Sequence, residues 1–179
     1  CLTVEELTSI WVAGSSVSSW NQVRSTFPDV EIDLYGPGTD SGTFDFFNEE
    51  ITGEEGSRSD YTASEDDNVL VNGVSGSPGG LGYFGLAYYE ENKDVLNAVQ
   101  VDDGNGCQPP EAAFQGNYYL ARPLYIYIAE SVKEKVEVKA FVDFYFLALD
   151  EIVPAVGYVP MLSDQKQAAL DAWKAFSQG

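Results

Sequence analysis

The sequence predicts a mixed α/β fold in which short strands alternate with amphipathic helices in layers. Two patterns predict this class. Apolar residues at helical spacing fill several segments, and between them lie short alternating apolar runs that end in glycine-rich turns. The chain has 179 residues, of which 44% are hydrophobic, so it can bury a core and can hold one domain plus part of a second.

The first half of the chain contains the clearest signals. Residues 4–13 have helical spacing, Thr3 and Glu6 form a capping box before them, and Gly14 ends them. Alternation over 30–35 predicts a strand, and the glycine-rich loop 36–43 leads from it into a helix. Ser64 and the three acids after it open the next helix, which is followed by the remaining elements of this half: strand 81–84, helix 86–92 and strand 98–101.

The second half is simpler. Residues 118–129 form an extended apolar segment, and its aromatic side chains are expected to be buried. Helices are predicted over 130–149 and 163–176, with residues 152–160 and their two prolines as a connection. The composition changes near residue 120, which is the natural domain boundary.

Charge and composition exclude several functions. Asp and Glu number 29 against 9 Lys and Arg, so the net charge of −20 opposes binding to nucleic acid or to an anionic membrane surface. The chain has no histidine, which removes Ser-His-Asp and Cys-His catalysis and ordinary zinc sites. Any site must therefore be built from carboxylates, hydroxyls, backbone amides and a few arginines.

The two cysteines, Cys1 and Cys107, allow two interpretations. One is a disulfide, which would indicate an oxidising compartment. The other is that Cys1 is a lipidated N-terminus. The helix that starts immediately after it leaves no tether, which speaks against lipidation.

The loop 36–43 carries the main chemical signal. Ser41, Gly42 and Thr43 would occupy the N-cap and first turn of a helix, where backbone N–H groups lack intrahelical partners and the helix dipole favours an anion. The loop lacks the Gly-Lys-Ser/Thr of a nucleotide P-loop and the spacing of a dinucleotide site. An oxyanion cradle is one interpretation, and a simple capped turn is the other.

Four further runs give the chain a family resemblance: GTDSGTFDFF (38–47), SDYTASEDDNVLV (59–71), GLGYFG (80–85) and RPLYIY (122–127). Together they closely resemble the phosphate-binding protein of bacterial phosphate ABC transporters, the PstS family. The resemblance implies a three-layer type II periplasmic-binding fold, with a central mixed sheet flanked by helices and phosphate held between two domains. It also implies a disulfide between Cys1 and Cys107, because one branch of the family has a cysteine pair there.

On this resemblance the chain corresponds to the latter half of the protein. Residues 1–120 would form the second, phosphate-binding domain, 121–129 a hinge crossing, and 130–179 helices that pack on the first domain. The implied partners are inorganic phosphate and the membrane permease of the transporter, with no cofactor and no metal. The implied location is the periplasm or the extracytoplasmic cell surface. Exposed C-terminal helices could also make a fragment of this kind a homodimer.

The resemblance implies phosphate-binding roles for individual residues of this sequence, position by position. Ser41, Gly42 and Thr43 match the family's Ser-Gly-Thr, implied to donate N–H and O–H groups to phosphate oxygens. Many members carry Arg four residues and Asp two residues before that Ser, but here those positions are Pro37 and Thr39. Thr39 is therefore assigned only as part of the binding loop.

Asp40 and Arg58 are the available carboxylate and guanidinium. Asp40 could accept the proton of hydrogen phosphate, which sulfate lacks, or merely cap the loop. Arg58 could pair with phosphate or be a solvated cation.

Two other functions remain open. A phosphatase-like enzyme could use the same cradle, but it would require a nucleophile with a base or metal, which this composition does not offer. A surface or interaction module could retain the fold without binding. The predicted function is a non-enzymatic phosphate receptor.

Overall fold

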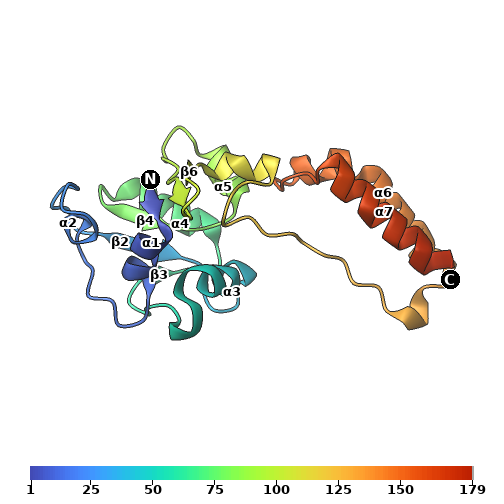
Figure 1. Cartoon of the computed structure of the whole chain (residues 1–179), viewed down its shortest axis with the longest axis horizontal. Coiled ribbons are helices and arrows are strands. Elements are labelled where there is room, and N and C mark those ends of the chain that lie inside the picture. The colour runs from blue at the N-terminus through green and yellow to red at the C-terminus, as the bar shows by residue number, and fades with distance from the viewer. Residues whose placement is uncertain (179) are drawn as a thin grey trace. The chain divides into compact units, whose positions relative to one another are not determined.

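The structure is a computed structural model that describes residues 1–178, with the side chain of Gln178 left out. The chain divides into two compact units (Figure 1). Unit 1 contains Cys1–Ala112 and Tyr118–Leu120; unit 2 contains Ala113–Asn117 and Ala121–Gly179, of which Gly179 lies outside the described residues. Each unit is described by itself.

A three-stranded parallel sheet in unit 1 has the order β3-β2-β4. The central strand β2 (Asp33–Gly36) pairs with β3 (Thr62–Ala63) on one side and with β4 (Gly80–Gly82) on the other. Helix α3 (Gly42–Phe47) connects β2 to β3, and α4 (Asp67–Gly76) connects β3 to β4. The predicted α/β class is therefore confirmed, and the carboxyl ends of all three strands meet at one edge.

A second sheet joins the ends of unit 1. It has the order β1-β5-β6. Strand β1 (Leu2–Thr3) pairs in parallel with β5 (Val101–Asp102), and β6 (Cys107–Gln108) pairs antiparallel with β5. The predicted disulfide is present and links Cys1 to Cys107, with Cα atoms 6.0 Å apart. The strands of unit 1 are only two to four residues long, so both sheets are small.

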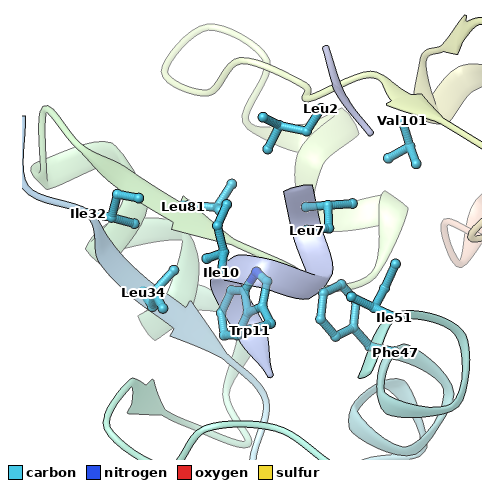
Figure 2. Packing of buried hydrophobic residues seen from close by; sticks show 10 residues of the cluster. All are labelled: Leu2, Leu7, Ile10, Trp11, Ile32, Leu34, Phe47, Ile51, Leu81 and Val101. Carbon is cyan, nitrogen blue, oxygen red and sulfur yellow. The ribbon is translucent and has the colours of Figure 1, made fainter. Parts of the chain in front are cut away.

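Helix α1 (Val4–Trp11) forms the centre of the core. Its capping box is present as predicted: the Thr3 amide donates to Glu6 Oε2 at 3.0 Å, and the Glu6 amide donates to Thr3 Oγ1 at 3.2 Å. Trp11 is 1% exposed and its ring meets Phe47 of α3 edge-on within the buried cluster of Figure 2. The helix ends two residues earlier than predicted because Ala13 donates its amide to the carbonyl of Gly56 in a neighbouring segment.

Several short elements were not predicted. They are α2 (Trp20–Val23), a π-helix (Asn48–Thr52) that continues α3, and 3₁₀ turns at Gly53–Glu55 and Pro110–Gln115. Another 3₁₀ turn, Glu130–Val132, lies at the start of the predicted helix 130–149. Helix α5 (Leu86–Glu91) lies where it was predicted. Helix α4 begins after Asp66, whose side chain accepts from the Asn68 amide at 3.0 Å, and not at Ser64.

Unit 2 is a helical hairpin made of α6 (Val136–Ala155) and α7 (Ser163–Gln178), which run side by side (Figure 1). Trp173 Nε1 donates to Asp143 Oδ1 at 2.7 Å, and Lys166 Nζ pairs with Asp150 at 2.6 Å, so the helices are antiparallel. Val142, Phe146 and Leu149 are buried between them with Trp173. The opposite face of α6 is apolar and exposed.

Two boundaries in unit 2 differ from the prediction. Helix α6 starts at Val136 and continues through Pro154 to Ala155, so the predicted connection begins later. Pro154 has no N–H to donate to the carbonyl of Asp150, and the helix ends one residue after it. Residues 121–129 form no helix or strand, and Tyr125 and Tyr127 are exposed, contrary to the expectation that these aromatics are buried. Among the described residues no helix is long and apolar enough to cross a membrane.

Candidate anion-binding site

The loop after β2 positions the predicted cradle. Ser41 is the N-cap of α3, and its Oγ accepts from the Thr43 amide at 3.1 Å. The Ser41 amide donates to the Gly38 carbonyl at 3.1 Å, which closes the turn. Thr39 and Asp40 are exposed in this turn. The five residues from Thr39 to Thr43 thus form a tight turn that leads into a helix N-terminus, where backbone amides favour an anion.

Sheet topology places this loop where α/β proteins bind ligands. From β2 the chain passes to β3 on one side of it, and from β3 it returns across to β4 on the other side. The sheet edge at the carboxyl ends of β2 and β4 is therefore a topological switch point, the usual ligand position in such sheets. The Ser41 cap lies at that end of β2.

Two tyrosines support the loop, and sequence reasoning did not identify them. The Tyr61 hydroxyl donates to the Pro37 carbonyl at 2.8 Å. Gly36 lies against both aromatic rings, since an added Cβ there would be 2.8 Å from Tyr83 Cε1 and 3.3 Å from Tyr61 Cε2. Both tyrosines lie in the family runs 59–71 and 80–85, but nothing in those runs indicates that their side chains reach a loop 24 or more positions away.

Acidic side chains flank the cradle. The Ser64 amide donates to the Gly36 carbonyl at 3.1 Å, which brings the segment after β3 beside the loop. The carboxylate of Glu65 occupies the space where Gly38 lacks a side chain. Burial, followed by repulsion from Asp66 and Glu65, raises the pKa of Asp67. Positive potential for an anion must therefore come from backbone amides and not from side chains at this edge.

Arg58 is held by partners outside the cradle. Its Nε and Nη2 donate to the two oxygens of Asp60 at 2.6 and 2.8 Å, and Nη1 donates to the carbonyls of Ile10 at 3.1 Å and Val17 at 2.8 Å. The ion pair raises the pKa of Arg58 and lowers that of Asp60. An arginine has five N–H donors, and these contacts use four. At most one N–H could reach a phosphate without rearrangement.

The described residues offer no ordinary metal site. One group of potential ligands comprises Cys1, Asp102 and Cys107, but the two sulfur atoms are joined in the disulfide. Only the half-buried carboxylate of Asp102 then remains, and it cannot hold a metal ion alone.

A family model described as a PBP superfamily domain matches residues 2–148, which is most of the chain. The chain belongs to this superfamily. The resemblance derived from the sequence motifs is therefore confirmed at the level of family and fold.

The curated relatives of this chain include SphX and PstS proteins. Protein SphX of Synechococcus elongatus is 42% identical over 184 residues, covering 99% of this chain and 55% of that protein. The phosphate-binding protein PstS of Staphylococcus epidermidis is 33% identical over 179 residues, covering 98% of this chain and 54% of that protein. The chain thus spans about half the length of these relatives.

Solved structures agree on the fold. The crystal structure of a possible phosphate-binding protein from Planctomyces limnophilus has a TM-score of 0.85 at 42% identity, covering 98% of this chain and 64% of that one. The crystal structure of PstS from Borrelia burgdorferi has a TM-score of 0.64 at 22% identity, covering 91% of this chain and 65% of that one. The second comparison shows the shared fold alone.

Proposed function

We propose that this chain supplies the phosphate-binding half of an extracytoplasmic receptor that delivers inorganic phosphate to the permease of a phosphate ABC transporter. The observation that carries the proposal is the Ser41-capped N-terminus of α3 at the switch point of the parallel sheet. Backbone amides there bind an anion without requiring a side-chain cation. The similarity to a phosphate-binding protein PstS over 98% of the chain supports phosphate as the anion.

The acidic character of the chain is compatible with this ligand. Exposed charges farther away than a Debye length of about 8 Å are screened at physiological salt. Amide N–H groups act on the anion directly, at about 2.7–2.9 Å for charge-assisted bonds. Local geometry therefore determines affinity, while the net charge of −20 slows the approach of the anion.

Phosphate is distinguished from sulfate by its proton. A carboxylate at the cradle accepts that proton, whereas sulfate offers none and leaves lone pairs facing each other. We assign this role to Asp40, the exposed carboxylate next to the Ser41 cap. Thr39 and Thr43 complete the loop, and Arg58 contributes at most one N–H.

The function is binding without covalent chemistry. The chain has no histidine to act as a base, and the named relatives are a phosphate-binding protein and SphX. In this proposal residues 1–120 form the phosphate domain, 121–129 cross the hinge, and 130–179 pack on the other domain of the receptor. The exposed side chains of Tyr125, Tyr127 and Phe141 support this arrangement, because large apolar groups are normally covered.

Calorimetry of the complete protein with orthophosphate, and separately with sulfate, tests the proposal. Ser41→Ala should weaken phosphate binding by about 10- to 100-fold, as expected for a lost hydrogen bond to a charged group. Thr3→Ala is the matched control: it removes the cap of α1 and costs about 1 kcal/mol of stability, but it should leave phosphate affinity unchanged.

Absence of phosphate binding by the wild-type protein would refute the proposal. Hydrolysis of a phosphomonoester by the wild-type protein that is lost in Ser41→Ala would favour the phosphatase alternative instead.

A further inference from the structure

Tyr61 contacts the binding loop from a different segment of the chain. It precedes β3, and its hydroxyl donates to the carbonyl of Pro37, the first residue after β2, at 2.8 Å. Its ring meets Trp11 edge-on with centroids 5.6 Å apart, so the core fixes the position of the hydroxyl. This hydrogen bond sets the orientation of the peptide from which the loop 37–41 starts.

Tyr83 lies beside Tyr61 and has no role in the ligand set. It follows β4, stacks on Phe47 of α3 with centroids 3.8 Å apart and planes 9° apart, and meets Trp11 edge-on at 5.0 Å. Its hydroxyl oxygen is buried and makes no hydrogen bond of normal geometry with the described residues. Burial, followed by the neighbouring Tyr61, raises the pKa of Tyr83, so the phenol is neutral and can donate.

The hydroxyl groups of Tyr83 and Tyr61 are complementary as hydrogen-bond donor and acceptor. A buried hydroxyl without a partner is costly, so Tyr83 requires an acceptor. The proton of Tyr61 is used toward Pro37, which leaves the lone pairs of its oxygen available. A hydrogen bond from Tyr83 to Tyr61 would satisfy the buried group and polarise the bond to Pro37.

We propose that Tyr61 is a positioning residue of the phosphate cradle, whose hydroxyl fixes the Pro37 carbonyl and is itself supported by the Tyr83 hydroxyl. The inference rests on the proposed function. A loop that is already fixed before the ligand arrives loses less conformational entropy on binding, so this bond raises phosphate affinity without touching phosphate. The pair ties the loop to β4 and, through the Phe47 ring, to the other end of α3.

The test is a set of tyrosine-to-phenylalanine variants of the complete protein, titrated with orthophosphate. Tyr61→Phe removes one hydroxyl and should weaken binding by about ten-fold. Tyr83→Phe should weaken it by about three-fold, and the double variant should match Tyr61→Phe, because Tyr83 acts through Tyr61.

Tyr119→Phe is the matched control, since its hydroxyl also donates to a backbone carbonyl, that of Glu50 at 3.2 Å, but not in the cradle loop. It should lose similar stability and bind phosphate as the wild type does. Wild-type affinity in Tyr61→Phe, or an equal loss in Tyr119→Phe, would overturn the inference.

Amide hydrogen exchange without ligand separates this inference from the proposed function. The Ser41 amide is protected by its bond to the Gly38 carbonyl, and it should exchange several-fold faster in Tyr61→Phe but not in Tyr119→Phe. If the wild-type protein fails to bind phosphate, the proposed function fails, while this exchange result still decides whether Tyr61 fixes the loop. Unchanged exchange in Tyr61→Phe would overturn its positioning role.

Discussion

Replacing Arg58 with alanine separates two roles of this side chain, one in the fold and one in anion binding. In the structure the guanidinium connects the C-terminal end of α1 to the segment before β3. We therefore expect Arg58→Ala to lower the free energy of unfolding as well as to affect phosphate affinity. The two effects have different sizes and are measured separately.

The structural effect can be worked out from the contacts. The Arg58 side chain is 11% exposed, and its bonds to the carbonyls of Ile10 and Val17 are worth about 1.5–3 kcal/mol each as hydrogen bonds to a charged group. The Asp60 carboxylate is 67% exposed, so that ion pair adds little. A polar pocket of about 280 Å³ adjoins the guanidinium, and water entering it would satisfy part of what is lost. The expected net destabilisation is about 2–4 kcal/mol.

The assay combines urea unfolding, followed by circular dichroism, with calorimetric titration of phosphate. Asp60→Asn is the control, because it keeps the arginine and both carbonyl contacts while weakening the exposed ion pair; it should cost about 0–1 kcal/mol. If Arg58 also donates its remaining N–H to phosphate, Arg58→Ala weakens binding by about 10- to 100-fold. A destabilisation below about 1 kcal/mol would refute the structural reasoning, and unchanged affinity would remove Arg58 from the phosphate site.

Three further predictions concern the same unit. Asp40→Asn should narrow the preference for phosphate over sulfate, measured by parallel calorimetric titrations, because the amide can donate an N–H to a sulfate oxygen, which a carboxylate cannot do; an unchanged ratio would exclude Asp40. Reduction of the Cys1–Cys107 bond, which closes a separation of 106 residues, should cost about 4.8 kcal/mol by the chain-entropy relation. Urea unfolding with and without reductant measures this cost, and no change would contradict the relation here. Gly73→Ala brings a Cβ into collision with one edge of the Tyr35 ring and should destabilise α4 in thermal unfolding. Gly76→Ala in the same helix meets no atom within 4 Å and should be neutral or stabilising.

The parts of the fold that were predictable depend on local signals. The start of α1 follows from Thr3 and Glu6, which satisfy each other's amides within one turn. The Ser41 cap follows in the same way from a hydroxyl residue placed between a glycine-rich loop and an apolar helical pattern. Such signals involve residues a few positions apart, so a sequence displays them directly.

The parts that were not predictable depend on contacts between distant residues. Arg58 reaches carbonyls 48 and 41 positions away, and every residue type has a carbonyl, so no sequence pattern marks the acceptor. The bond from Tyr61 to the Pro37 carbonyl, 24 positions away, is hidden for the same reason. Pro154 misled the prediction in another way: a proline normally breaks a helix before it, but α6 continues through Pro154 and ends at Ala155.

Helix α6 has an exposed apolar face. One face of α6 is buried against α7 through Val142, Phe146 and Leu149. Its other face is exposed, with exposed fractions of 65% for Phe141, 59% for Phe144 and 81% for Leu147. The helix is therefore apolar on two faces, of which α7 covers one. Helices that are apolar all round are normally buried.

Since the chain spans about half the length of its curated relatives, we expect the other half of the receptor to cover this face. The 179-residue chain alone should then associate through it. Light scattering should show a dimer or larger species that Phe144→Asp reduces to a monomer, with Ala172→Asp on the exposed side of α7 as the control. A strict monomer that binds phosphate at micromolar affinity would instead show that the 179 residues are a complete receptor, because an uncovered face and a half-site are each incompatible with that result.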